Sequence, residues 1–455
     1  MPPPRTGTHS ILRPAARRNR RGQKTLSPGT NNCLVGRRVG PARTRPRNLP
    51  SGGRSTCVEW KTDRYRTRRS ALPKRVLTIL NYYHPYLSGL SEYARRIAEG
   101  LAGAGCQVTV LTGRHDPGLP KEELLHGVRV IRAEPWFFLH KGYVSTELFS
   151  LFQELSPAAD LLHLHLPMLE AGPLAMGASS QVPVVASYQC DVTPQRSGSA
   201  MDWAAVTAVR LSARLCLRRA DRITVTSVDY AASSPVLRGF ESKWTVIHPP
   251  DDAPAFRPRV APPPGAPRVG FLGRFAPEKG LDILLEAIPL VLQHVPGAHF
   301  ILAGNHASVA GGSEYRRLEA RITALGAAVK IPGIIPAAEL SDFYRSLDVF
   351  VLPSVDSYEA FGMVQIEAMK AGVPVVATSR PGVRVPITLT GNGILVPPGD
   401  AVALAGAIMQ ILSARERFAP DRVAAAAWRV FPPGKPVDQT LACYQSAMHE
   451  RAGRR

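Results

Sequence analysis

The sequence predicts an α/β protein with two doubly wound sheets that face each other across a cleft. Short β-branched apolar runs alternate with segments of helical periodicity from residue 74 onward, which is typical of parallel sheets covered by helices. The alternation stops at residues 249–267, where eight of 19 residues are proline, and then restarts. At roughly 100–200 residues per domain, the chain that follows the N-terminal segment is long enough for two domains.

The first expected domain covers residues 73–248. A strand at 74–80, a helix that ends at Gly105 and a second strand at 108–112 form a βαβ unit, which requires parallel pairing. Further strands are expected at 128–132, 161–166, 184–187 and 223–226.

The second expected domain covers residues 268–435, and residues 436–455 form a last helix, at 437–447, and a tail. Strands are expected at 269–272, 300–303, 348–352 and 373–377, and helices at 280–295 and 361–371. Ligands of open parallel sheets bind outside the carboxyl ends of the strands, so the cleft between the domains is the expected site.

The net charge of +21 is concentrated at the N-terminus. Residues 1–75 hold 20 Lys and Arg and two acidic residues, so they carry +18 and the rest of the chain is close to neutral. Residues 1–72 are rich in Arg, Pro, Gly and Ser, and we expect a disordered tail. An extension without function, a targeting segment and a nucleic-acid-binding arm all fit this composition. No aromatic residue precedes Trp60, which argues against base stacking, so no specific nucleic-acid partner is expected.

Cysteine and histidine usage gives no metal signature. Six cysteines are scattered without a CxxC pair, which fits a reducing cytoplasm. His163 and His165 share one face of a strand, but no third ligand is evident, so we expect packing and no metal. Arg210, Arg214 and Arg218 recur every four residues, and either a solvated helix face or contact with anionic lipid fits this pattern. No apolar run approaches the ~18 residues of a transmembrane helix.

The first chemical motif is the segment 273–280, between an expected strand and an expected helix. Arg274 and Lys279 lie five residues apart in it and are flanked by glycines. Glycine lets the backbone approach a ligand closely, and these two cations suit a diphosphate. The alternative is an ordinary loop with two solvated cations.

The second motif holds two glutamates, Glu359 and Glu367, eight residues apart. Phe361 and Gly362 open the expected helix between them, whose first N–H groups offer an anion site. Glu367 lies about two turns further along and could accept hydrogen bonds from vicinal hydroxyls such as those of a ribose. The alternative is that Glu359 only complements the helix dipole and Glu367 is solvated.

Three ordered motifs make the chain resemble glycosyltransferase family 4. They read GR-x4-KG from Gly273, E-x-FG-x4-EAM-x2-G-x-PVVA from Glu359 and G-x-G-x-LVPPGD from Gly391, and the resemblance covers about residues 74–412. It implies a GT-B fold with an N-terminal acceptor domain and a C-terminal nucleotide-sugar domain. It also implies a retaining enzyme without metal or cofactor. Such an enzyme would move a mannose- or glucose-type hexose from GDP-mannose or a UDP-hexose to a hydroxyl of a lipid, glycan or small molecule.

The resemblance assigns a role to individual residues. Arg274 and Lys279 would bind the donor diphosphate, Glu367 the ribose, and Glu359 would lie near the transferred sugar. The other implied donor contacts are Gly89, Gly273, Phe361, Gly362 and Met363. The implied acceptor contacts are Tyr86, Ser88 and His165. The last helix is expected to pack back on the N-terminal domain.

The sequence departs from the family pattern at two positions. Gln189 replaces a histidine that contacts the transferred sugar, and Val385 stands where a glutamate is common. Glutamine keeps a hydrogen bond but cannot become cationic, so Gln189 is expected among the catalytic residues in an altered role. A weak or silent nucleotide-sugar-binding paralogue is therefore a second hypothesis. Two further hypotheses are a nucleic-acid-binding protein and a GT-B enzyme that uses phosphate or water in place of a sugar acceptor. The expected location is the cytoplasm, with peripheral contact to the inner membrane face if the acceptor is lipid-linked.

Overall fold

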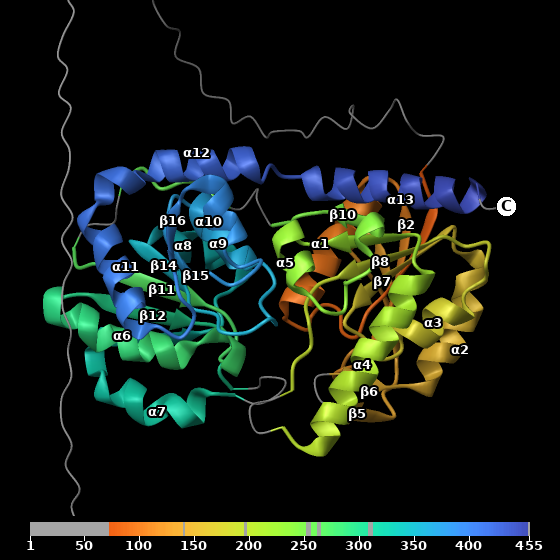
Figure 1. Ribbon diagram of the computed structural model, residues 1–455, viewed down its shortest axis with the longest axis horizontal. Helices are drawn as coiled ribbons and strands as arrows, with labels where there is room; N and C mark the ends of the chain where they lie inside the picture. The colour runs from red at the N-terminus through yellow and green to blue at the C-terminus, as the bar shows by residue number, and fades with distance from the viewer. Residues whose placement is uncertain are drawn as a thin grey trace, which may run out of the picture. The chain divides into compact units, whose positions relative to one another are not determined.

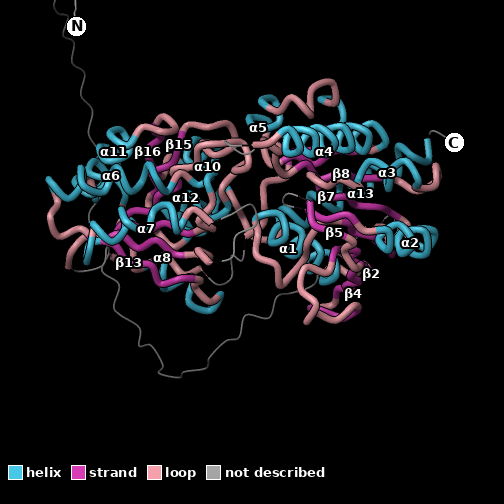
Figure 2. Tube along the Cα trace, turned by 90° about the horizontal axis from the view of Figure 1, so that it is seen from below, coloured by secondary structure: helices cyan, strands magenta, loops and turns pink. Residues whose placement is uncertain are grey.

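The computed structural model describes residues 72–139, 142–194, 198–251, 256–261, 265–307 and 313–453. Most strands form two large sheets, one built before the proline-rich segment and one after it (Figure 1). In each sheet the strands are surrounded by helices (Figure 2). The predicted basic tail lies outside the described residues except for Leu72, which packs against the core of the first domain.

The N-terminal domain contains a sheet of strand order β10-β9-β8-β7-β1-β2-β4-β3. All neighbours pair in parallel except β3, which is antiparallel to β4. The strands are β1 (Arg75–Ile79), β2 (Gln107–Gly113), β3 (Glu122–Leu125), β4 (Val128–Ala133), β7 (Leu161–Leu166), β8 (Val184–Tyr188), β9 (Arg222–Val225) and β10 (Trp244–Val246). A separate hairpin consists of β5 (Phe137–Leu139) and β6 (Gly142–Val144). Strand β7 is buried along its whole length, as expected for a central strand covered on both faces.

The helices of this domain begin at polar capping residues. Ser88 starts α1 with a capping box, in which its hydroxyl accepts from the Ser91 N–H and the Ser91 side chain binds the Ser88 N–H. Ser145 and Ser227 cap α2 and α5, and Ser199 forms a capping box at α4. The helices are α1 (Gly89–Gly103), α2 (Thr146–Leu155), α3 (Ala171–Gly177), α4 (Ala200–Arg219) and α5 (Val228–Ser233).

The C-terminal domain contains a fully parallel sheet of order β13-β12-β11-β14-β15-β16. Its strands are β11 (Arg268–Leu272), β12 (His299–Ala303), β13 (Val329–Gly333), β14 (Val349–Leu352), β15 (Val375–Thr378) and β16 (Gly393–Val396). Its helices are α6 (Leu281–His294), α7 (Tyr315–Ala324), α8 (Leu340–Arg345), α9 (Met363–Lys370), α10 (Val385–Thr390), α11 (Ala401–Ser413) and α12 (Pro420–Val430). Both sheets are α/β layers of the expected class, and every strand predicted from the alternating pattern is present.

Several element boundaries differ from the prediction by one or two residues, and the last helix is longer than expected, at Lys435–Gly453. Two of the differences lie next to the second motif. Helix α9 begins at Met363, with Gly362 as its N-cap residue, and not at Phe361. Strand β15 begins at Val375 and not at Val373, since Pro374 has no N–H to donate to a ladder.

The proline-rich segment is not only a linker. Phe256 and Arg259 are buried, and the Arg259 backbone N–H donates to the Ala371 carbonyl at 3.1 Å while its Nε donates to the Gly372 carbonyl at 3.2 Å. These carbonyls follow the end of α9, where a cationic side chain is favoured. Residues 256–259 of this segment therefore pack on the C-terminal domain.

The last helix, α13 (Lys435–Gly453), packs back on the N-terminal domain, as expected (Figure 1). Tyr444 shares a buried apolar cluster with Tyr93 and Ile97 of α1. Its hydroxyl lies 2.7 Å from Nδ1 of His163 on β7. The chain thus crosses between the domains twice.

Two of the three regularly spaced arginines of α4 bind backbone carbonyls. Arg210 donates to the Val192 carbonyl at 2.7 Å, and Arg214 to the Val236 carbonyl at 2.9 Å. These contacts explain their spacing without a lipid surface, and Arg218 alone of the three is exposed. Among the described residues, no helix has the length and apolar character to cross a membrane.

Candidate functional site

A cavity of about 780 Å³ lies between the two domains, at the carboxyl ends of β1, β8 and β11 and at the start of α1 and α9. It brings together residues that are far apart in the sequence. All but one of the predicted site residues line it, namely Tyr86, Ser88, Gly89, Gln189, Gly273, Arg274, Lys279, Glu359, Phe361, Gly362, Met363 and Glu367. The cavity therefore lies at the position predicted for the ligand-binding cleft between the two domains.

The two cations of the glycine-flanked loop each form an ion pair with a glutamate. Arg274 lies 3.0 Å from Glu278 of the same loop, and Lys279 binds Glu359 from the loop before α9. The second pair joins the two sequence motifs directly. A diphosphate that binds here must therefore share or take over these cations, whose charge is already balanced by carboxylates.

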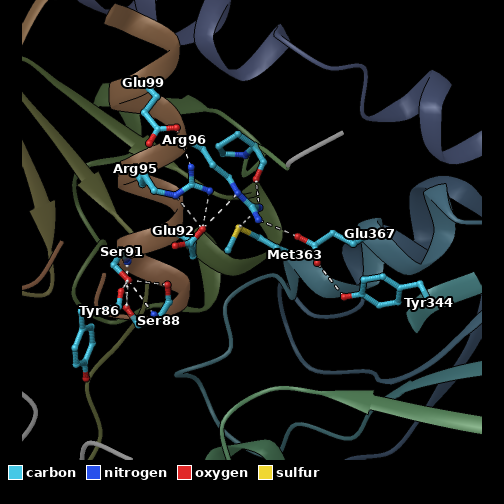
Figure 3. A network of polar contacts seen from close by, with 11 residues as sticks. Tyr86, Ser88, Ser91, Glu92, Arg95, Arg96, Glu99, Tyr344, Met363 and Glu367 are labelled. Carbon is cyan, nitrogen blue, oxygen red and sulfur yellow. Dashed lines mark hydrogen bonds and ion pairs between the residues drawn. The ribbon is translucent and has the colours of Figure 1, made fainter. Parts of the chain in front are cut away.

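Glu367 lies in a contact between the two domains (Figure 3). Its Oε1 accepts from Arg96 of α1 at 3.1 Å, and its Oε2 accepts from the Tyr344 hydroxyl at 2.9 Å. The Glu367 side chain is 5% exposed and that of Arg96 is 9% exposed. Arg96 also donates to the Pro250 carbonyl at 3.0 Å. The solvated-surface alternative for Glu367 is therefore wrong.

Burial raises the pKa of Tyr344 well above its ordinary value, and the negative charge and hydrogen bond of Glu367 raise it further. The Tyr344 hydroxyl thus stays protonated and donates to the carboxylate. Neither Arg96 nor Tyr344 was predicted. Arg96 is 271 residues from Glu367 in the sequence, and no local spacing connects the two.

The start of α1 faces α9 across the cavity. A Cβ on Gly89 would lie 4.0 Å from Cε of Met363, so the two predicted donor residues are close neighbours. Ser88 is occupied by helix capping, and the Ser91 hydroxyl donates to the Tyr86 carbonyl at 2.6 Å (Figure 3). These bonds hold the loop that contains Tyr86 and Ser88 in place.

The predicted residues Gln189 and His165 belong to a buried polar network. Gln189 lines the cavity, and its Nε2 lies 3.3 Å from Nδ1 of His165. His165 is fully buried behind it and is not part of the cavity wall. Its ring centroid lies 4.2 Å from that of His163, whose Nε2 is 2.7 Å from the Ser187 hydroxyl.

Both histidines are uncharged at neutral pH. Burial lowers the pKa of His163 to about 3, and burial together with His163 lowers that of His165 well below its ordinary value. The described residues contain no group of three or more His, Cys, Asp or Glu side chains placed to hold a metal ion. The structure therefore gives this pair a role in packing and hydrogen bonding.

Val385 belongs to an apolar cluster under the cavity wall, with Phe361, Ile366 and Phe431. It is the second position at which the sequence departs from the family pattern, and the His248 ring also packs on this cluster, with centroids 5.3 Å from Phe361 and 5.5 Å from Phe431. The neighbouring Arg384 instead reaches the N-terminal domain and binds Asp229 at 3.0 Å. The valine at position 385 thus contributes to the apolar packing around Phe361.

The fold and the site define a GT-B glycosyltransferase, and the chain belongs to the group 1 glycosyltransferases of family 4. Residues 252–425 match the family model described as "Glycosyl transferases group 1", and residues 88–250 match the "Glycosyl transferase 4-like domain". The GDP-mannose-dependent alpha-mannosyltransferase of Mycobacterium tuberculosis is 30% identical over 360 residues, which cover 76% of this chain and 90% of that protein.

Two further relatives agree with this assignment. The D-inositol 3-phosphate glycosyltransferase of Geodermatophilus obscurus is 28% identical over 424 residues, which cover 85% of this chain and 92% of that one. Among solved structures, Anabaena HepE in complex with UDP and glucose has a TM-score of 0.63 at 22% identity. That comparison covers 81% of this chain and 98% of HepE, and it shows the shared fold.

Proposed function

We propose that this protein transfers a hexose of the mannose or glucose type from a nucleoside diphosphate sugar to a hydroxyl group, with retention at the anomeric carbon. The observation that carries the proposal is the meeting of Arg274, Lys279, Glu359 and Glu367 in one cavity at the start of α9. Two cations and a helix N-terminus can stabilise a departing diphosphate, while two carboxylates can bind sugar and ribose hydroxyls.

The ion pairs suggest how the donor enters. The diphosphate takes Lys279 from Glu359, and the released carboxylate accepts hydrogen bonds from hydroxyls of the transferred sugar. Arg274 remains between Glu278 and the phosphates. The bond between the anomeric carbon and the diphosphate oxygen then breaks, the acceptor oxygen bonds on the same face, and its proton passes to the departing phosphate.

We expect this reaction to need no metal ion or cofactor, because Arg274, Lys279 and the first amides of α9 offset the charge of the leaving group. The relative named GDP-mannose-dependent and the HepE complex with UDP support GDP-mannose and a UDP-hexose as candidate donors. Cys106, Cys216 and Cys443 are buried free thiols, which is consistent with a cytoplasmic location. Peripheral membrane contact would follow from a lipid-linked acceptor.

A second candidate function is nucleotide-sugar binding with weak or no transfer. It is favoured by Gln189, which lines the cavity where the family has a histidine. The two candidates share donor binding and differ in turnover, so one set of measurements separates them.

The test is a thermal-shift and calorimetric screen of UDP-, GDP- and ADP-sugars against the full chain, with and without EDTA. We expect selective stabilisation by one nucleotide, and loss of at least tenfold in affinity for Lys279→Ala. The matched control is Lys330→Ala, because Lys330 is an exposed lysine on the edge strand β13. Equal affinity of both variants for the nucleotide would contradict the diphosphate assignment. Transfer in the presence of acceptors, followed by NMR of the product anomer, then distinguishes an active retaining enzyme from a silent binder.

A further inference from the structure

One tyrosine hydroxyl connects the two loops that carry Gln189 and Glu359. Tyr230 belongs to α5 of the N-terminal domain and is 1% exposed. Its hydroxyl accepts from the backbone N–H of Asp191 at 2.5 Å and donates to the backbone carbonyl of Ser357 at 2.8 Å. Asp191 comes two residues after Gln189, and Ser357 comes two residues before Glu359. A hydroxyl can donate and accept at the same time, and this one is used in both directions.

The N-terminal side of this connection is held by a buried carboxylate. Asp191 is buried, and its Oδ1 accepts from the Tyr188 hydroxyl at 2.5 Å and from the Ser234 hydroxyl at 2.7 Å. Tyr188 ends β8, and Ser234 is the C-cap residue of α5. The backbone N–H of Gln189 donates to the carbonyl of Leu166, the last residue of β7, at 3.0 Å. The segment that presents Gln189 to the cavity is therefore bound to the ends of three buried elements.

The C-terminal side of the connection lies in the loop between β14 and α9. Ala360 of this loop belongs to the apolar core cluster of the N-terminal domain, together with Tyr230. The hydroxyl of Thr226, which follows β9, donates to the Ala360 carbonyl at 3.3 Å. A Cβ on Gly382 would lie 2.1 Å from the Ala360 carbonyl oxygen and 3.0 Å from Cδ2 of Tyr230, so the backbone packs closely on both. The loop that carries Glu359 thus packs against the N-terminal domain although its chain belongs to the C-terminal one.

The two loops meet where the family resemblance places the transferred sugar. Gln189 and Glu359 both line the cavity, whereas Tyr230 lies behind its wall. The diphosphate and the ribose are assigned instead to residues such as Arg274 and Glu367, whose hydrogen bonds involve other partners. A shift of either loop would therefore change the fit around the sugar and leave most contacts to the nucleotide in place.

We propose that Tyr230 is a positioning residue for the transferred sugar. Its hydroxyl holds the Gln189 loop of one domain against the Glu359 loop of the other, so that both side chains reach the same sugar. Tyr230 itself touches no substrate and acts through these two loops. The inference rests on the proposed transferase function, and it adds a residue that neither chemical motif of the sequence contains.

The test measures the sugar and the nucleotide separately on the full chain. Calorimetry gives the Kd of UDP and UDP-glucose, and of GDP and GDP-mannose, for the wild type and for Tyr230→Phe, which removes the hydroxyl and keeps the buried ring. We expect the Kd of the nucleotide sugar to rise at least fivefold and that of the nucleoside diphosphate to change less than twofold. In transfer assays kcat should fall at least tenfold, because a small misplacement at the reacting centre costs more in rate than in binding.

Tyr444→Phe is the matched control. Tyr444 is also buried, and its hydroxyl also has a hydrogen bond, at 2.7 Å to Nδ1 of His163. Its loss should lower the melting temperature about as much as the loss of the Tyr230 hydroxyl, with no selective effect on the nucleotide sugar or on kcat. Ser234→Ala removes one of the two hydroxyls that hold Asp191, and we expect the same selective pattern at a smaller size, at least twofold. It keeps the proposal testable if Tyr230→Phe does not fold.

The outcomes separate the positioning role from the transferase function. Equal weakening of nucleotide and nucleotide sugar, no change in either, or the same selective loss in Tyr444→Phe would overturn the role of Tyr230. A wild-type chain that binds the nucleotide sugar without transferring it would contradict the proposed function, and the selective loss in Tyr230→Phe would still uphold the positioning role. A wild-type chain that binds no nucleotide sugar would overturn both.

Discussion

Replacing Arg96 by methionine is expected to tighten nucleotide binding while lowering the thermal stability of the free protein. Arg96 holds Oε1 of Glu367 from the opposite domain, and Tyr344 holds Oε2 (Figure 3). If the donor ribose binds Glu367, it must displace or share these contacts. Methionine keeps most of the aliphatic volume of the side chain and removes the charge.

The magnitude follows from the geometry of this pair. At 3.1 Å and an effective dielectric constant of about 20, the Coulomb attraction is about 5 kcal/mol before desolvation is counted. Desolvation of two nearly buried side chains offsets most of that, and we take a net value of about 1.4 kcal/mol. A nucleotide that no longer has to replace this contact gains about tenfold in affinity. The free protein should melt about 2–4 °C lower for each kcal/mol lost.

The assay is calorimetric titration with UDP and GDP together with a melting curve of the free protein. Arg95→Met is the matched control, since Arg95 pairs with Glu92 and Glu99 of its own helix, at 2.9 and 2.8 Å. Opposite changes in stability and affinity for Arg96→Met alone would support the reasoning. Weaker nucleotide binding would refute it, because Arg96 would then be a donor ligand rather than a competitor for Glu367.

Three other substitutions test separate parts of the site. Gln189→His should raise kcat at least threefold at an unchanged nucleotide Kd if the missing imidazole limits turnover, and a lower kcat in steady-state assays would contradict this. Gly280→Ala should destabilise the protein by more than about 2 kcal/mol in chemical denaturation, because φ is +65° there and a Cβ would lie 2.1 Å from the Pro353 carbonyl oxygen. Arg384→Ala should cost less than about 1 kcal/mol, since its pair with Asp229 is partly exposed, and a larger loss that persists at high salt would contradict this.

Much of the architecture was predictable because its signals are local. The β-branched runs before and after the proline-rich segment became the strands of two parallel sheets, and Gly273–Gly280 and Glu359–Glu367 lie where a strand leads into a helix or a helix begins. Such patterns depend on residues a few positions apart, whose geometry a strand or helix determines by itself. We could also predict that these motifs meet in one cavity, because parallel sheets bind ligands at the carboxyl ends of their strands.

The composition of the site could be predicted only in part. The sequence indicated Arg274, Lys279, Glu359 and Glu367 as site residues. It did not indicate that Arg274 pairs with Glu278 and Lys279 with Glu359. Nor did it indicate that Arg96 binds Glu367. Ion-pair partners are chosen by distance in space. No periodicity in α1 marks Arg96 rather than Arg95 as the residue that reaches the other domain.

The sequence by itself determined the class of protein, the order of its elements and the residues that match the family's donor site, because these depend on short-range pattern and motif. Only the tertiary structure decided which carboxylate each cation meets, that His165 lies behind Gln189, and that Glu367 is held between Arg96 and Tyr344. The physical reason is that burial and charge pairing depend on segments that meet only when both sheets and the last helix have packed together. The pairing of charges inside the cavity is therefore a property of the fold, whereas the residues of the proposed donor site are already visible in the sequence.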